Sequence, residues 1–133
     1  HYTNSYAQDS KDMQRPIKFR AWGGKRMIEW EEYQQDNLAP WKTISIDNFP
    51  LVHMQYTGLH DKNGKDCYEG DILRFDERIG NVVVVWKFDG FTLESRKYSE
   101  SKENYERRSL SNATRLEIIG NIYENPEFTP SSK

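Results

Sequence analysis

Two tight-turn dipeptides divide the middle of the sequence into short apolar runs, and this spacing favours antiparallel β-strands. Asn63 with Gly64, and Asp89 with Gly90, are each flanked by runs of residues that favour strands. Such dipeptides suit a type I′ hairpin turn, in which both central residues have positive φ. We therefore expect positive φ at both Asn63 and Gly64. We also expect residues 91–94 to return antiparallel to the strand before them.

The most apolar run, VVVVW at residues 82–86, predicts the central strand of the fold. An unbroken β-branched run is typical of a strand that is buried on both faces. Residues 116–123 predict the last strand, and Gly120 followed by Asn121 interrupts its alternation as a bulge would. Further strands are expected at residues 51–58 and 72–75.

The segment before these strands predicts a β-hairpin. Residues 17–22 alternate apolar and polar side chains with a period of two. Gly23 and Gly24 then allow a tight turn, and residues 27–30 are expected to form the returning strand. Residues 43–46 could form one more short strand.

The polar stretch at residues 96–114 leaves two alternatives, a short helix around residues 100–108 or a loop. From residue 66 to residue 123 the expected strands are short and joined by tight turns. Strands of this number and length close most economically as a small barrel. We therefore predict a mostly β fold, in which the C-terminal half forms a small barrel and an N-terminal β-hairpin extends from it.

A chain of 133 residues has the length of one domain. Residues 1–12 are polar and aperiodic, and we expect them to be an appended, processed or disordered leader before Met13. We assign residues 13–128 to a single domain, with the barrel core at about 66–123, and residues 129–133 to a polar tail.

Nothing in the sequence has the length and apolarity of a membrane span or a secretory signal. The single cysteine, Cys67, excludes an intrachain disulfide and fits a reducing compartment. We therefore expect a protein of the cytoplasm, without a membrane partner.

The charge is balanced overall but unevenly placed. Nineteen basic and 21 acidic residues give a net charge of −2, whereas a dedicated nucleic-acid binder is usually strongly basic. Basic residues nevertheless gather near the N-terminus, and the acidic residues of 29–36 follow them. A nucleic-acid-binding surface and an ordinary solvated face both fit this pattern. The candidate basic patch consists of Arg15, Lys18, Arg20, Trp22, Lys25 and Arg26.

The residues that could support catalysis or metal binding follow no recognised pattern. His53, His60, Cys67 and the neighbouring carboxylates do not have the spacing of a known metal site. Cys67 with either histidine is the one candidate nucleophile pair, but its acidic neighbours Asp66 and Glu69 disfavour the thiolate. We predict that the chain is not an enzyme and has no catalytic residues, no metal and no cofactor.

Three motifs, taken together, resemble the YopX family, whose members are found mainly in bacteriophages and prophages. The first is IKFRAW at residues 17–22. The second is the central series QYTGL, DKNGK and YEGDI within residues 55–72, and the third is IGNIYENP at residues 119–126. The resemblance implies an SH3-like barrel and an association with phage. It implies no catalytic or binding residues.

The central motif can be explained in two ways. Its glycines and aspartates are typical of tight turns, in which side chains accept hydrogen bonds from nearby backbone N–H groups. Alternatively, its polar side chains converge on a ligand. The candidate binding or signature residues are Gln55, Tyr56, Thr57, Asp61, Tyr68, Glu69 and Asp71.

From these observations we expect a phage- or prophage-associated accessory protein that acts in the bacterial host cell. We expect it to be a non-enzymatic binding module with a protein partner. The alternative is a nucleic-acid-binding module, in which case the basic patch near the N-terminus would contact phosphates.

Overall fold

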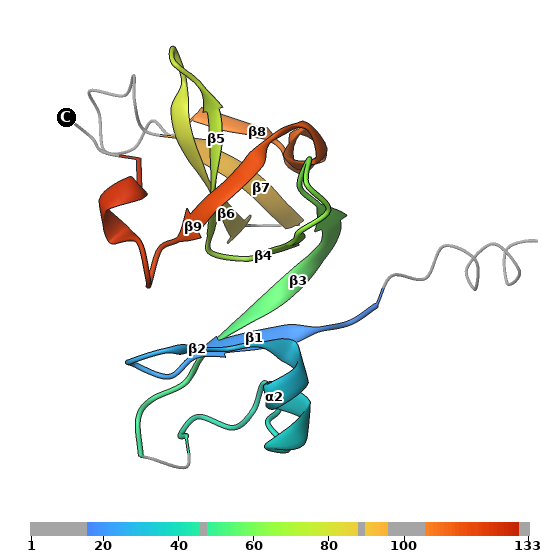
Figure 1. The fold of residues 1–133 in the computed structure, drawn as a ribbon, viewed down its shortest axis with the longest axis vertical. Coiled ribbons are helices and arrows are strands. Elements are labelled where there is room, and N and C mark those ends of the chain that lie inside the picture. The colour runs from blue at the N-terminus through green and yellow to red at the C-terminus, as the bar shows by residue number, and fades with distance from the viewer. Residues whose placement is uncertain (1–15, 46–47, 88–89, 96–105, 131–133) are drawn as a thin grey trace, which may run out of the picture.

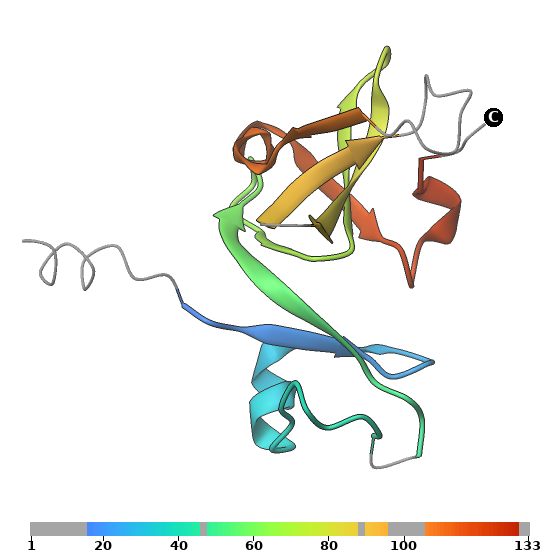
Figure 2. The same ribbon diagram turned by 180° about the vertical axis from the view of Figure 1, so that it is seen from behind.

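The computed structural model describes residues 16–45, 48–87, 90–95 and 106–130. The fold is mostly β and consists of two sheets with few helical turns, as the sequence predicts (Figure 1). The N-terminal sheet has the order β2-β1-β3-β4, and the C-terminal sheet has the order β8-β7-β6-β5-β9. The second sheet curls into a half-barrel, which is consistent with the small barrel expected for the C-terminal half (Figure 2).

The N-terminal sheet comprises β1 (Phe19–Trp22), β2 (Met27–Ile28), β3 (Val52–His60) and β4 (Asp66–Tyr68). The expected hairpin is present, because Ala21 pairs with Ile28 across β1 and β2. The C-terminal sheet comprises β5 (Asp71–Asp76), β6 (Gly80–Lys87), β7 (Gly90–Ser95), β8 (Glu106–Ser109) and β9 (Glu117–Asn121). Two 3-10 helices, Leu110–Arg115 and Pro126–Phe128, flank β9.

The returning strand of the N-terminal hairpin is shorter than predicted. It ends at Ile28, and helix α2 (Trp30–Gln35) occupies positions that the sequence assigned to the end of a strand. Trp30 and Tyr33, three residues apart, fall on one face of α2, and their ring centres lie 5.8 Å apart with the rings tilted. That face covers the side of β1 that points away from the C-terminal sheet (Figures 1 and 2). The small core between α2 and the N-terminal sheet contains Ala21, Ile28, Tyr33 and Leu51.

Strand β6 is central in its sheet, as predicted, but it is not buried on both faces. Val82 and Val84 point into the main core, whereas Val83 and Val85 are half-buried and Trp86 is 53% exposed. One face of the valine run therefore packs inward and the other lines the surface between the sheets. Strand β7 returns antiparallel, with Lys87 opposite Gly90, so that residues 88–89 connect the two strands. These two residues lie outside the described part of the chain.

The hairpin between β3 and β4 differs from the predicted type I′ turn. Gly64 has φ of +82°, but Asn63 is not among the residues with positive φ. Gly64 N donates to Asp61 O, and Asp61 N donates to Lys65 O. This pattern is a type I turn followed by a left-handed glycine, the other hairpin connection that ends in glycine. The prediction of positive φ at Asn63 is therefore wrong.

The closing motif forms the predicted bulge and a side-chain-capped turn. Ile72 pairs with Gly120 and Leu73 pairs with Ile118, so one residue of β9 is left over between them. Asn125 Oδ1 accepts the backbone N–H of Asn121. A Cβ atom on Gly120 would overlap this same oxygen.

Other predictions have mixed outcomes. Residues 43–46 form no strand in the described part of the chain, apart from an isolated bridge between Ile44 and Pro50. Residues 106–108 belong to β8 rather than to a helix, because β8 pairs with β7. Residues 100–105, for which a helix and a loop were the alternatives, the leader at residues 1–12 and the end of the tail fall outside the described residues. None of the described helices is both long enough and apolar enough to cross a membrane.

Candidate functional site

A buried ion pair joins the two sheets. Arg20, on β1, donates from Nη2 to Asp71 Oδ1 at 2.8 Å, and the two side chains are only 5% and 2% exposed. Asp71 Oδ2 accepts the backbone N–H of Tyr68 at 2.7 Å, and the Arg20 guanidinium lies 4.8 Å from the centre of the Tyr68 ring. Burial raises the pKa of Asp71, and the charge of Arg20 opposes this shift. Because both groups are buried, the pair serves the architecture at the start of β5.

Two further signature residues are bound within the protein. Asp61 accepts three backbone N–H groups, from Asn63 and Lys65 in its own turn and from Ile118 in β9. Burial alone would raise the pKa of Asp61, but these hydrogen bonds outweigh it and lower the pKa. Thr57 donates its hydroxyl to the carbonyl of Cys67 at 2.7 Å. These contacts show that Asp61 and Thr57 stabilise the turn and the strand pairing around them.

The remaining signature residues lie along the pairing of β3 with β4. Tyr56 is opposite Tyr68, and their ring centres are 5.6 Å apart. Gln55 O accepts the backbone N–H of Glu69. The signature residues therefore lie together where the two sheets meet, a region that we call the joint. Asp61 lies at one end of it, in the hairpin between β3 and β4.

The structure places part of the predicted basic patch in this same joint. Lys18 Nζ lies 2.7 Å from Asp66 Oδ2 and 4.8 Å from the Tyr56 ring centre, and His60 contacts the other oxygen of Asp66 at 2.9 Å. A pocket of about 430 Å³ opens beside these side chains. Its lining has opposing charges and comprises Lys18, Arg20, Glu29, Trp30, Glu31, Gly64, Lys65, Asp66 and Tyr68.

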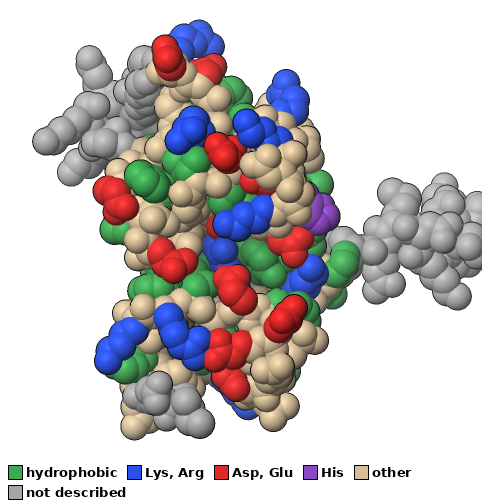
Figure 3. All heavy atoms as spheres, in the orientation of Figure 1, with side chains coloured by type: hydrophobic (Ala, Val, Ile, Leu, Met, Phe, Trp, Pro, Cys, Tyr) green, Lys and Arg blue, Asp and Glu red, His purple; other side chains and the backbone are tan. Residues whose placement is uncertain are grey.

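The other members of the basic patch are engaged elsewhere. Trp22 stacks on Tyr123 at 5.7 Å, and Lys25 lies over the ring of Phe49. Arg26 makes two contacts with Glu32, at 2.6 and 2.5 Å. Arg15 lies outside the described residues. Figure 3 shows basic and acidic side chains intermixed on the face that it presents, rather than a surface of one sign.

Cys67 is fully buried in the C-terminal core. Burial, and next the charge of Asp71, raise the pKa of its thiol to about 12. Both candidate histidines have other contacts: His53 with Tyr33 and Lys42, and His60 with Asp66. Within the described residues no three His, Cys, Asp or Glu side chains are grouped so that they could hold a metal ion.

A partly apolar pocket that no sequence pattern predicted lies in the N-terminal sheet, between the β1–β2 turn and the loop after α2. Its volume is about 520 Å³. Trp41, next to a lining residue, is 80% exposed, and Ile44 in the lining is 58% exposed. We call this site the N-terminal pocket; it is lined by Gly23, Lys25, Arg26, Ile28, Asp36, Leu38, Lys42, Ile44, Ser45 and Phe49. The tryptophan after Pro40 was the available sequence signal for this site, because no strand that would bury Trp41 in the core is predicted there.

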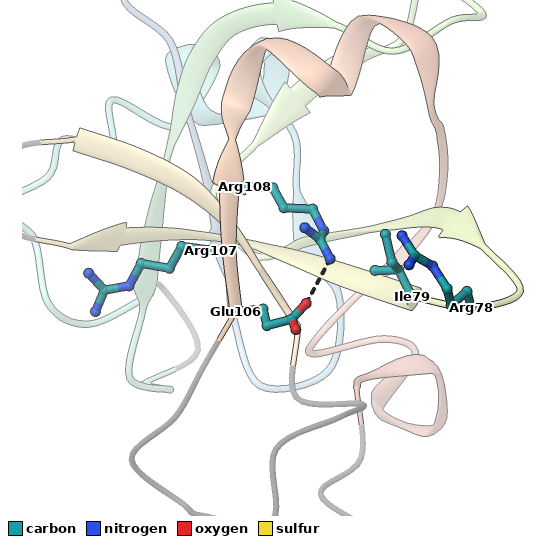
Figure 4. A pocket seen from close by; sticks show the side chains of 5 residues that line it. All are labelled: Arg78, Ile79, Glu106, Arg107 and Arg108. Carbon is teal, nitrogen blue, oxygen red and sulfur yellow. Dashed lines mark hydrogen bonds and ion pairs between the residues drawn. The ribbon is translucent and has the colours of Figure 1, made fainter.

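Two further candidates border the C-terminal sheet. A cleft of about 310 Å³ between the sheets is lined by apolar residues of β3 and β6 together with Ile122 and Tyr123. A depression of about 550 Å³ is lined by Arg78, Ile79, Glu106, Arg107 and Arg108. Figure 4 shows that Arg108 points toward Glu106, whereas Arg107 points away from the other two arginines. The three guanidinium groups therefore do not converge on one point.

These observations define a mostly β protein whose central sequence motif joins two sheets and whose exposed apolar surface lies elsewhere. The chain belongs to the YopX protein family, whose model matches residues 18–128. This confirms the resemblance that the three motifs indicated. The crystal structure of protein EF1440 from Enterococcus faecalis is similar, with a TM-score of 0.55 and 27% sequence identity over 86% of this chain and 98% of that one. No curated protein matches the sequence.

Proposed function

We propose that this chain is a non-enzymatic binding module of a phage or prophage, and that its partner in the bacterial host cell is a protein. The observation that carries this proposal is the N-terminal pocket with its neighbouring tryptophan. Trp41 is 80% exposed and directly precedes Lys42, which lines this pocket of about 520 Å³. Aromatic side chains next to a pocket are the residues that contribute most to protein interfaces.

The chemistry of the signature supports a binding role over catalysis. Asp71, Cys67 and Asp61 are buried, and Asp61 accepts three backbone N–H groups. A general acid, base or nucleophile must reach a substrate. The polar residues that the sequence singles out are therefore better explained as parts of the joint between the sheets.

A nucleic-acid-binding module remains the second candidate. The depression of Figure 4 favours it, because its lining contains three arginines, Arg78, Arg107 and Arg108, and only one carboxylate, that of Glu106. Against it, Lys18, Arg20 and Arg26 in the N-terminal half are each paired with a carboxylate. Paired cations have less to gain from a phosphate contact.

The test is recovery of partners from lysogenic host cells by the tagged protein, with and without nuclease. We expect a protein partner that is recovered equally in both conditions and that is lost with Trp41→Ser. Trp86→Ser is the matched control, because Trp86 is also exposed but lies on the other sheet. Recovery that disappears after nuclease treatment would favour the second candidate.

A further inference from the structure

We propose that the N-terminal pocket binds an acidic peptide segment that inserts one bulky apolar side chain. This inference rests on the proposed protein-binding function and names the kind of segment that the partner presents. Four side chains of the lining are apolar, those of Ile28, Leu38, Ile44 and Phe49. A volume of about 520 Å³ lies within the usual range of ligand-binding pockets, about 300–1,000 Å³.

The rim of the pocket determines the charge of the segment. Three basic residues, Lys25, Arg26 and Lys42, line it together with one acid, Asp36. Arg26 is paired with Glu32, but within the described residues neither lysine forms an ion pair. Lys25 lies 5.1 Å from the Phe49 ring centre, and Lys42 donates to the carbonyl of Asn37. Two ammonium groups beside an apolar wall complement a segment in which carboxylates flank an apolar residue.

The same rim argues against more highly charged ligands. Asp36 lines the pocket and Glu32 lies beside Arg26, so a phosphate-rich chain or an anionic membrane would bring its charges close to two carboxylates. The excess of positive charge is small. A peptide with a few carboxylates gains from the two lysines while its apolar side chain occupies the cavity.

The loop that forms one side of the pocket is held by a chain of hydrogen bonds from the core. His53 Nε2 lies 2.5 Å from the carbonyl of Lys42, which can only accept, so Nε2 carries the proton. Nδ1 then accepts from the hydroxyl of the buried Tyr33 at 2.8 Å. Lys42 is thereby fixed at the rim.

The other side is held by Ser45 and Phe49. Ser45 N donates to Phe49 O, and Phe49 N donates to the Ser45 hydroxyl. The ring of Phe49 packs against the β1–β2 turn, where a Cβ atom on Gly24 would lie 3.2 Å from it. Described residues on both sides of the pocket are thus held by hydrogen bonds, and such preorganisation lowers the entropic cost of binding.

The probe is a fluorescein-labelled peptide in which one phenylalanine and one leucine are flanked by glutamates and aspartates. We expect saturable binding, measured by fluorescence anisotropy, that weakens as the salt concentration rises from about 0.05 M to about 0.5 M. A peptide with lysines in place of the acids, and one with serines in place of the two apolar residues, should each bind at least about tenfold more weakly.

Variants of the protein test the assigned residues. The double reversal Lys25→Glu with Lys42→Glu should weaken binding of the acidic peptide at least about tenfold, and Ile44→Ser should weaken it without altering the salt dependence. Lys62→Glu with Lys65→Glu is the matched control, because it makes the same charge change in the exposed turn between β3 and β4. Equal losses in the two double reversals would overturn the assignment.

The remaining outcomes separate this inference from the proposed function. If the acidic peptide does not bind but a nuclease-resistant, Trp41-dependent protein partner is recovered, the inference fails and the proposed function stands. A further outcome is that the peptide fails to bind, whereas an oligonucleotide, or vesicles of phosphatidylcholine and phosphatidylglycerol in equal parts, do bind. If that binding is lost with Lys25→Glu and Lys42→Glu, both the inference and the proposed protein-binding function are overturned. Self-association lost with the same reversals would assign the pocket to a second copy of the chain and overturn the inference.

Discussion

Arg20 on β1 and Asp71 at the start of β5 form a buried 2.8 Å ion pair, although 51 positions separate them in the sequence. The pair connects the first strand of the N-terminal sheet to the first strand of the C-terminal sheet. Its two members belong to different motifs of the family, IKFRAW and YEGDI. The two motifs are therefore parts of one contact.

Removal of one partner of this pair should be costly. Arg20→Met leaves the Asp71 carboxylate buried without its counter-charge, and we expect a loss of about 3–5 kcal/mol of unfolding free energy. Arg20→Met with Asp71→Asn should cost less than the sum of the single changes. The exposed pair of Arg74 and Glu117, 3.5 Å apart, is the control, and Arg74→Met should cost at most about 1 kcal/mol. Urea unfolding measures all four values, and an additive result for Arg20 and Asp71 would contradict the coupling.

Asp61 should make stability depend on acid pH. Its pKa is lower in the folded chain than in the unfolded chain, so its carboxylate stabilises the fold above the unfolded value, about 4. That contribution is lost as the pH falls through the folded pKa. Asp61→Asn should therefore be less stable at neutral pH and show a flatter dependence below pH of about 4. The pKa of Glu32, which the hydrogen bond from Arg26 lowers, affects both proteins equally. Parallel curves for the two proteins would exclude this role.

Gly64 should be sensitive to substitution while its neighbour is not. Its φ is +82°, and a Cβ atom there would meet no neighbour within 4 Å, so only backbone strain opposes a side chain. Gly64→Val should cost at least about 1–2 kcal/mol. Asn63→Ala should have little effect, because Asn63 does not have positive φ. A large loss of melting temperature for Asn63→Ala would instead favour the type I′ turn.

Val84 should not tolerate a charge. It is 1% exposed at the centre of the main core, and an unpaired carboxylate there would cost several kcal/mol, comparable to a total stability of about 5–15 kcal/mol. We expect Val84→Asp to be unfolded or insoluble. Val85→Asp places the same charge on the half-buried face and should remain folded. Circular dichroism and solubility distinguish the two variants, and a soluble, native-like Val84→Asp would refute the assignment of the core.

Cys67 should be unreactive in the folded protein. Burial raises the pKa of the thiol to about 12, so the thiolate is scarce at neutral pH. A disulfide reagent should label the thiol only at the rate of unfolding, and labelling should accelerate with added urea. Labelling of the native protein as fast as a free model thiol would contradict the burial of Cys67.

The strands could be predicted from the sequence because turn residues and apolar periodicity are local signals. The type of the turn at residues 61–65 was predicted wrongly because it depends on a contact between residues that are distant in the sequence. Both hairpin types end in glycine, and Asp61 selects the observed one by accepting hydrogen bonds from its own turn and from Ile118, 57 positions away. Helix α2 was missed because its six residues are too short to display a helical period, and only packing against β1 reveals it.

The candidate sites were harder to predict, because they depend on strand register. From the sequence, Lys18 and Arg20 were assigned to the basic patch, whereas Tyr68 and Asp71 were assigned to the central signature. The pairing of β1 with β3 and of β3 with β4 brings them together. The N-terminal pocket depends in addition on loop geometry, which no local pattern in residues 36–49 specifies.

The contact between Gly120 and Asn125 has a consequence for how relatives of this chain can diverge. A Cβ atom at position 120 would overlap the Asn125 oxygen that holds the backbone N–H of Asn121. A relative that acquires a side chain at position 120 must therefore rebuild the turn and lose the asparagine at position 125 as well. We expect the two positions to change together during evolution, so that glycine at the first and asparagine at the second are inherited as a single unit.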